Sequence, residues 1–88
     1  MTKYSKLRMF LENTPAHVSK VILSFDQIDM ILKEAGRNNK LPFSARTHHQ
    51  FWENQKDLSL RPQTKAWHDA GFAVSKINLT AQWIEFER

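Results

Sequence analysis

The stretch LPFSARTHHQFWEN, residues 41–54, decides how the rest of the chain is arranged. Pro42 ends a polar loop because its ring blocks helical hydrogen bonding, and Ser44 is a residue type that caps helix N-termini. From Ala45 onward, apolar and polar residues recur at a helical spacing. We therefore predict a helix over residues 45–55, with one aromatic side and one polar, partly basic side.

The segments around this helix predict a frame of further helices and strands. Helices are predicted over residues 3–12, from a cap at Ser24 to Gly36, and over residues 63–70. Strands are predicted over residues 18–23, 72–79 and 82–87. Ser24 and Gln27 match a capping box, and the irregular alternation of residues 72–79 leaves room for a β-bulge.

The order helix, strand, helix, helix, short helix, strand, strand predicts an α+β domain with a small three-stranded antiparallel sheet. Without the short helix this is the order of a winged helix. The connection over residues 37–43 is longer than the usual turn of about three or four residues, and the short helix separates residues 45–55 from the hairpin. We expect one winged-helix-like domain over residues 1–88.

Composition predicts a cytoplasmic protein with a small aromatic core. The 88 residues include six Phe, three Trp, one Tyr and no Cys, so no disulfide supports the fold. No apolar run approaches the roughly 20 residues of a membrane span, and no signal peptide follows the first residues.

The formal net charge of +4 is concentrated in the middle of the chain. Six basic and two acidic residues lie between Arg37 and Lys65, whereas the rest of the chain has seven of each. A local basic excess beside a helix suits a polyanion. A solvated basic surface would give the same pattern.

Six short blocks run along the whole chain. They are Lys3-Tyr4-x-x-Leu7, Leu23-Ser24-Phe25-x-x-Ile28, Leu41-Pro42-x-Ser44-Ala45, Phe51-Trp52-x-Asn54, Ala66-Trp67-x-x-Ala70-Gly71-Phe72 and Phe86-x-Arg88. Together they resemble a family of small uncharacterised bacterial and phage-borne domains, in which Trp often stands at the position of Phe51. The resemblance implies a domain of this extent and no catalytic residue.

The polar side of the predicted helix supplies the candidate contacts to nucleic acid. Arginine pairs with guanine, asparagine and glutamine pair with adenine, and threonine bonds phosphate. The residues predicted to face base edges are Arg46, Thr47, Gln50 and Asn54. The residues predicted to contact backbone phosphates are Lys40, Lys56, Arg61 and Lys65. An ordinary solvated helix face is the alternative, and Asn54, which belongs to the shared blocks, could instead serve the fold as a cap.

The histidines do not predict a metal site or an enzyme. His48 and His49 are adjacent, so on a helix they diverge by about 100° and cannot easily share one ion. The neighbouring His68 and Asp69 have no nucleophile at a recognisable spacing. We predict a non-enzymatic protein without catalytic residues, metal or cofactor.

The tryptophans suggest the alternative function. Trp52 and Trp67 are predicted to be core residues. Strand alternation places Ile84 and Phe86 on one face and Trp83 on the other, beside Glu85 and Glu87. An outward Trp83 suggests a protein-interaction module, such as a phage-encoded inhibitor or adaptor. The expected partners are therefore DNA or another nucleic acid, and alternatively a protein or a second copy of the chain, but no membrane.

Overall fold

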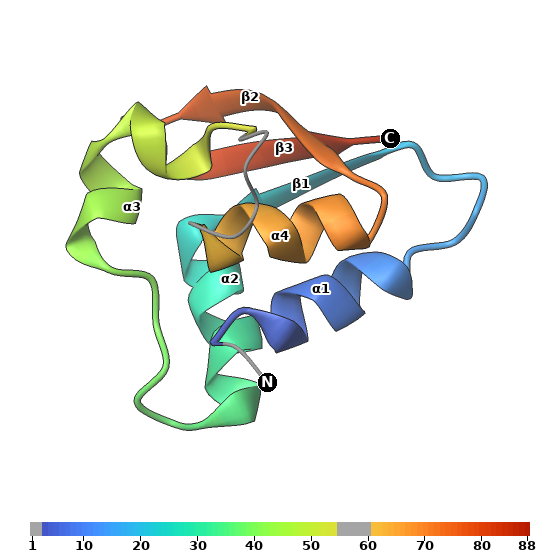
Figure 1. Ribbon diagram of the computed structural model, residues 1–88. Coiled ribbons are helices and arrows are strands. Elements are labelled where there is room, and N and C mark those ends of the chain that lie inside the picture. The colour runs from blue at the N-terminus through green and yellow to red at the C-terminus, as the bar shows by residue number, and fades with distance from the viewer. Residues whose placement is uncertain (1–2, 55–60) are drawn as a thin grey trace.

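The computed structural model describes residues 3–54 and 61–88 and has the predicted α+β class. The elements in chain order are α1 (Ser5–Glu12), β1 (Lys20–Ser24), α2 (Phe25–Leu32), the 3₁₀ helix η1 (Lys33–Ala35), α3 (Phe43–Thr47), the 3₁₀ helix η2 (His49–Trp52), α4 (Pro62–Asp69), β2 (Ala73–Asn78) and β3 (Trp83–Glu87). The strands form one antiparallel sheet in the order β1-β3-β2. Helices α1, α2 and α4 lie on one side of this sheet, and α3 lies beside it (Figure 1).

The junction of β1 and α2 has the predicted capping box. The Ser24 hydroxyl accepts a hydrogen bond from the Gln27 N–H at 3.1 Å, and the Gln27 side-chain oxygen accepts from the Ser24 N–H at 2.8 Å. Both donors would otherwise be unpaired at the helix start. The capping box therefore turns the chain from strand into helix without an intervening loop.

The predicted continuous helix over residues 45–55 is wrong. Helix α3 already begins at Phe43, after an N-cap at Pro42 rather than at Ser44. His48 then adopts an extended conformation, with φ −128° and ψ 125°, and η2 follows as a separate turn. In a continuous helix the Ala45 carbonyl would accept from the N–H of the fourth residue after it. Here that carbonyl accepts from the Trp52 indole N–H at 2.7 Å instead.

Trp52 breaks the helix because its ring belongs to an aromatic column through the core. Its ring stacks between Phe25 and Trp67, with centroid distances of 5.5 and 5.7 Å, and Phe86 lies 5.6 Å beyond Trp67. Trp52 is 2% exposed and Trp67 is 1% exposed, which confirms both as core residues. Burying such rings outweighs the modest preference of this stretch for a regular helix.

The C-terminal elements follow the prediction closely. Proline at the start of α4 is favourable because the first helical N–H needs no partner, and Gly71 follows the helix with φ 85°. The register between β2 and β3 shifts between Val74 and Lys76, which confirms the β-bulge. Ile84 and Phe86 are fully buried on the helix-covered face, as predicted.

Within the described part of the chain, no helix is both long and apolar enough to cross a bilayer.

Candidate functional site

Arg46 lies against α2 rather than on an outward recognition surface. Its guanidinium forms ion pairs with Asp29 at 2.5 Å and Asp26 at 3.2 Å, and donates to the Gln82 side chain at 3.2 Å. Burial alone would lower the pKa of Arg46, but the hydrogen bonds to the two carboxylates more than offset this and raise it. Arg46 is therefore a permanent cation that joins α3 to α2 and to the β2–β3 turn.

Asn54 is also occupied by the fold. Its amide nitrogen donates to the Val74 carbonyl at 2.9 Å, and its oxygen accepts from the Val74 N–H at 2.9 Å and the Trp67 indole at 3.2 Å. Asn54 thus pairs with β2 as a neighbouring strand residue would. This arrangement agrees with a structural role for Asn54, although it is a bridge between elements rather than a helix cap.

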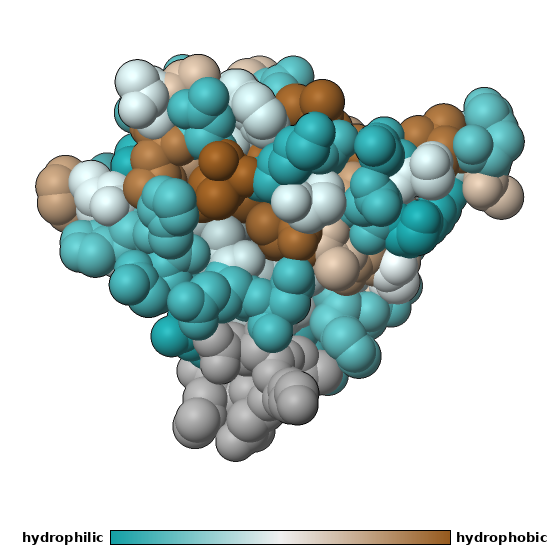
Figure 2. Space-filling model, turned by 90° about the horizontal axis from the view of Figure 1, so that it is seen from above, coloured by the Kyte–Doolittle hydropathy of each residue, from teal (hydrophilic) through white to brown (hydrophobic). Residues whose placement is uncertain are grey.

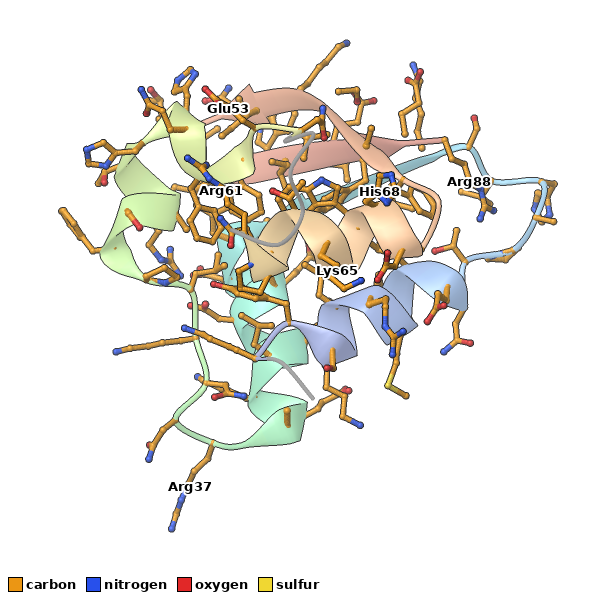
Figure 3. The ribbon with its side chains drawn as sticks, in the orientation of Figure 1. Arg37, Glu53, Arg61, Lys65, His68 and Arg88 are labelled. Atoms are coloured by element: carbon orange, nitrogen blue, oxygen red, sulfur yellow. The ribbon has the colours of Figure 1, made fainter. Side chains whose placement is uncertain are left out.

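The remaining predicted contacts lie on different elements. The Thr47 hydroxyl donates to the Phe43 carbonyl at 3.0 Å. Lys65 pairs with Asp69 at 2.8 Å on α4. Lys40 is exposed in the loop before α3, and Lys56 lies outside the described residues. Figure 3 places Lys65 on α4 and Arg37 at a distant end of the molecule.

Gln50 and Arg61 are predicted residues from different elements that the structure brings together. Arg61 directly precedes α4 and donates a hydrogen bond to the Gln50 carbonyl in η2. Both belong to a shallow hollow of about 440 Å³, which we call the Arg61 hollow. Its lining residues are Ser44, His48, Gln50, Phe51, Arg61 and Gln63.

The Arg61 hollow is chemically suited to an anion. Arg61 supplies a fixed positive charge, and its hydrogen bond to the Gln50 carbonyl uses one of its five N–H donors. Ser44, His48 and Gln50 are exposed around it and add hydroxyl, imidazole and amide groups. None of the six lining residues is acidic. The lining also includes the partly buried ring of Phe51.

Sequence reasoning missed four members of this hollow. The sequence predicts Ser44 as a helix cap and predicts no ligand contact for His48, Phe51 or Gln63. The extended conformation of His48 separates α3 from η2, which is what allows residues from three elements to meet. No local pattern in the sequence predicts that α3 and η2 are separate.

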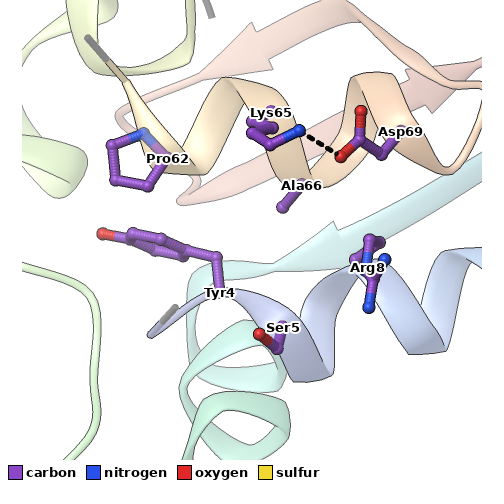
Figure 4. A pocket seen from close by; sticks show the side chains of 7 residues that line it. All are labelled: Tyr4, Ser5, Arg8, Pro62, Lys65, Ala66 and Asp69. Atoms are coloured by element: carbon purple, nitrogen blue, oxygen red, sulfur yellow. Dashed lines mark hydrogen bonds and ion pairs between the residues drawn. The ribbon is translucent and has the colours of Figure 1, made fainter. Parts of the chain in front are cut away.

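A second cavity, of about 190 Å³, lies between α1 and α4. Figure 4 shows the Tyr4 ring beneath Pro62, with the ion pair of Lys65 and Asp69 along the opposite rim. Arg8 also lines this cavity and pairs with Glu12 at 3.8 Å. Both cations have a carboxylate partner, so this cavity is less suited to an anion than the Arg61 hollow.

The histidines lie at the surface. His48 and His49 are both exposed, and the His48 ring nitrogen lies 2.8 Å from the Thr47 hydroxyl. Within residues 3–54 and 61–88, no three His, Asp or Glu side chains come together in a way that could hold a metal ion.

Trp83 lies on the sheet face opposite the helices, but less openly than predicted. It is partly buried, and its neighbour Glu85 is only 5% exposed. The prediction that Glu85 is an open outward charge is therefore wrong. Its carboxylate accepts a hydrogen bond from the Ser75 hydroxyl at 3.1 Å, which compensates for its burial.

Comparison with known proteins gives one family. No curated protein and no solved structure has significant similarity to the chain. The model of one protein family, described as a domain of unknown function (DUF7662), matches residues 4–88. The match includes every helix and strand described above, and the chain therefore belongs to this family of domains of unknown function.

Proposed function

We propose that this domain binds nucleic acid and that phosphates of the nucleic-acid backbone bind at the Arg61 hollow. DNA is the simplest ligand with which to test this. The observation that carries the proposal is the position of Arg61 in a hollow whose described lining residues include no carboxylate. Arg46 and Lys65, in contrast, are already ion-paired. Arginine recognises phosphate with a planar fork of donors, and the net charge of +4 favours a polyanion.

The winged-helix-like arrangement is part of this proposal. In that arrangement the recognition helix directly precedes the hairpin, and the helix in this position is α4 rather than α3. Arg61 is the N-cap residue of α4. Phe51 offers an apolar ring beside the phosphate site, against which a base can pack.

The proposal predicts salt-dependent binding that depends on Arg61. We expect a fluorescent mixed-sequence duplex, and a single strand of equal length, to bind with a log affinity that falls linearly with log salt concentration. Each phosphate contact to duplex DNA contributes a slope of about −0.9. Arg61→Gln should weaken binding and make the slope less steep by about that amount.

Arg37→Gln is the matched control. Arg37 is an exposed arginine away from the hollow, so its replacement removes the same charge without changing the site. We expect Arg37→Gln to leave the slope nearly unchanged. Absence of binding at low salt, binding indifferent to salt, or equal effects of the two substitutions would contradict the proposal.

A second candidate function is protein interaction through the sheet face that carries Trp83. Its specific support is the exposed Ile22, 59% accessible, on the same face as Trp83. Figure 2 shows hydrophobic residues grouped in the middle of this side and hydrophilic residues around them. Such a patch is typical of contact sites.

This candidate predicts a stoichiometric protein partner whose capture is lost in Trp83→Ala and retained in Met30→Ala, a change of an exposed residue on α2. Capture that is equal in both variants would exclude a Trp83-centred contact.

A further inference from the structure

Strand β1 has an open hydrogen-bonding edge. The Phe25 N–H donates to the Gln82 carbonyl and the Arg88 N–H to the Ser19 carbonyl, so odd-numbered residues of β1 face β3. Hydrogen bonds alternate along an antiparallel pair, so Lys20 and Ile22 direct their N–H and C=O groups away from the sheet. No hydrogen bond to these groups comes from residues 3–54 or 61–88.

The opposite edge of the sheet is at least partly closed. At Val74 in β2, both backbone groups are bonded to the Asn54 side chain. At β1, the corresponding groups of Ile22 have no such partner among the described residues, and the Ile22 side chain is 59% exposed. Free backbone groups at strand spacing, with an apolar side chain between them, are complementary to another extended strand.

We propose that the occupant of this edge is the β1 strand of a second copy, paired antiparallel about a two-fold axis at Ile22. Each Ile22 would exchange two hydrogen bonds with its counterpart. Ser24 would stand opposite Lys20 of the other copy, but its N–H is bonded to Gln27 and its carbonyl, at the N-cap of α2, accepts the first helical hydrogen bond, so the hydrogen bonds between the copies are those of Ile22. The two sheets would then join into one sheet of the order β2-β3-β1-β1-β3-β2.

The apolar centre of the edge favours a second copy over an unrelated strand. Antiparallel pairing about Ile22 places the two Ile22 side chains, each 59% exposed in the single chain, side by side on the same face, so each covers apolar surface of the other. Lys20 at the start of β1 is paired with Glu87 at 3.5 Å, and Asp26 just past its end is paired with Arg46 at 3.2 Å. Neither residue therefore brings an unpaired charge to the contact between the copies.

Sedimentation velocity and light scattering over a concentration series test the dimer directly. We expect a monomer–dimer equilibrium in the wild-type chain. Ile22→Lys places like charges opposite each other at the two-fold axis and should raise the dissociation constant about tenfold or more. Met30→Lys adds the same charge at another exposed position, 69% accessible, and should leave the equilibrium unchanged.

A cysteine cross-link keeps the test independent of the folding of Ile22→Lys. The chain has no Cys, so Ile22→Cys introduces a single thiol. Directly paired residues have Cα atoms about 5.5 Å apart, within the range of a disulfide. We expect mild oxidation to cross-link Ile22→Cys much faster than Met30→Cys. A monomer at every concentration, or equal cross-linking of both variants, would overturn the inference.

Discussion

Asn54 acts as a side-chain substitute for a strand neighbour. It satisfies both backbone groups of Val74 and the indole N–H of the buried Trp67. Asparagine suits this role because its amide carries both a donor and an acceptor. One side chain thereby fixes the end of η2 to β2 and to α4.

We expect Asn54→Ala to lower the free energy of unfolding by about 1–3 kcal/mol, because it leaves the Trp67 N–H and the Val74 groups without partners. Asn54→Asp retains the acceptor but loses the donor to the Val74 carbonyl, so it should also destabilise. Urea denaturation measures both. Gln50→Ala, an exposed position in η2, is the control and should change stability by no more than about 0.5 kcal/mol. Equal stability of all three variants would refute the bridging role.

Tyr4 provides a pH-dependent probe of the interior. It is 5% exposed, and burial raises its pKa to about 12, whereas the unfolded value is about 10. The folded state therefore favours the neutral phenol. Its contribution to stability is fully present below about pH 10 and is lost as the pH rises toward 12.

Because Tyr4 is the only tyrosine, tyrosinate absorbance reports it alone. We expect a titration midpoint near the raised pKa, and a free energy of unfolding that decreases above about pH 10. Tyr4→Phe removes this titration and is the control for other effects of high pH on stability. A midpoint near 10 in a chain that circular dichroism shows to be folded would contradict the burial argument.

At the scale of elements, Gly71 ends α4 in a backbone conformation that residues with a side chain rarely adopt. Gly71 has φ 85°, in the left-handed region that costs other residues about 1–2 kcal/mol. Gly36 follows η1 with φ 168°, an extended conformation that any residue adopts. The two glycines therefore form a natural pair for comparison.

We expect Gly71→Ala to destabilise the protein by about 1–2 kcal/mol, although a Cβ there would meet no atom within 4 Å. Gly36→Ala should not destabilise it, since its Cβ would lie at an ordinary 3.9 Å from the Asn39 side chain. Thermal denaturation of both variants measures the difference. Equal losses would mean that backbone conformation is not the cause.

At the scale of the whole molecule, the aromatic column holds the elements together. It passes from Phe25 in α2 through Trp52 and Trp67 to Phe86 in β3. The other buried apolar residues form one cluster with it. A contiguous core of this kind in a small domain favours all-or-none unfolding.

We therefore expect the tryptophan fluorescence and far-ultraviolet circular dichroism of the wild-type chain to give coincident denaturation curves. Loss of the fluorescence signal before the helical signal would show that the aromatic column unfolds separately. Trp83→Phe is a useful control, because it removes the tryptophan outside the column and leaves the fluorescence of Trp52 and Trp67.

The sequence by itself determined the features whose causes are local. The capping box needs only Ser24 and Gln27, three residues apart. The burial of Ile84 and Phe86 follows from strand alternation, and the end of α4 follows from Gly71. In each case the interacting groups are neighbours along the chain, so spacing and residue type are sufficient information.

Only the tertiary structure decided the roles of the residues from Phe43 to Asn54. Arg46 meets Asp26 and Asp29, and Asn54 meets Val74, across separations of 17 to 20 residues. The extended conformation of His48 occurs together with the hydrogen bond from the Trp52 indole N–H to the Ala45 carbonyl. The Trp52 ring lies in a core made by elements that are distant in the sequence. Helical periodicity describes a segment alone. Burial of aromatic surface and pairing of buried polar groups depend on segments that the fold brings together, and here those terms exceed the local preference.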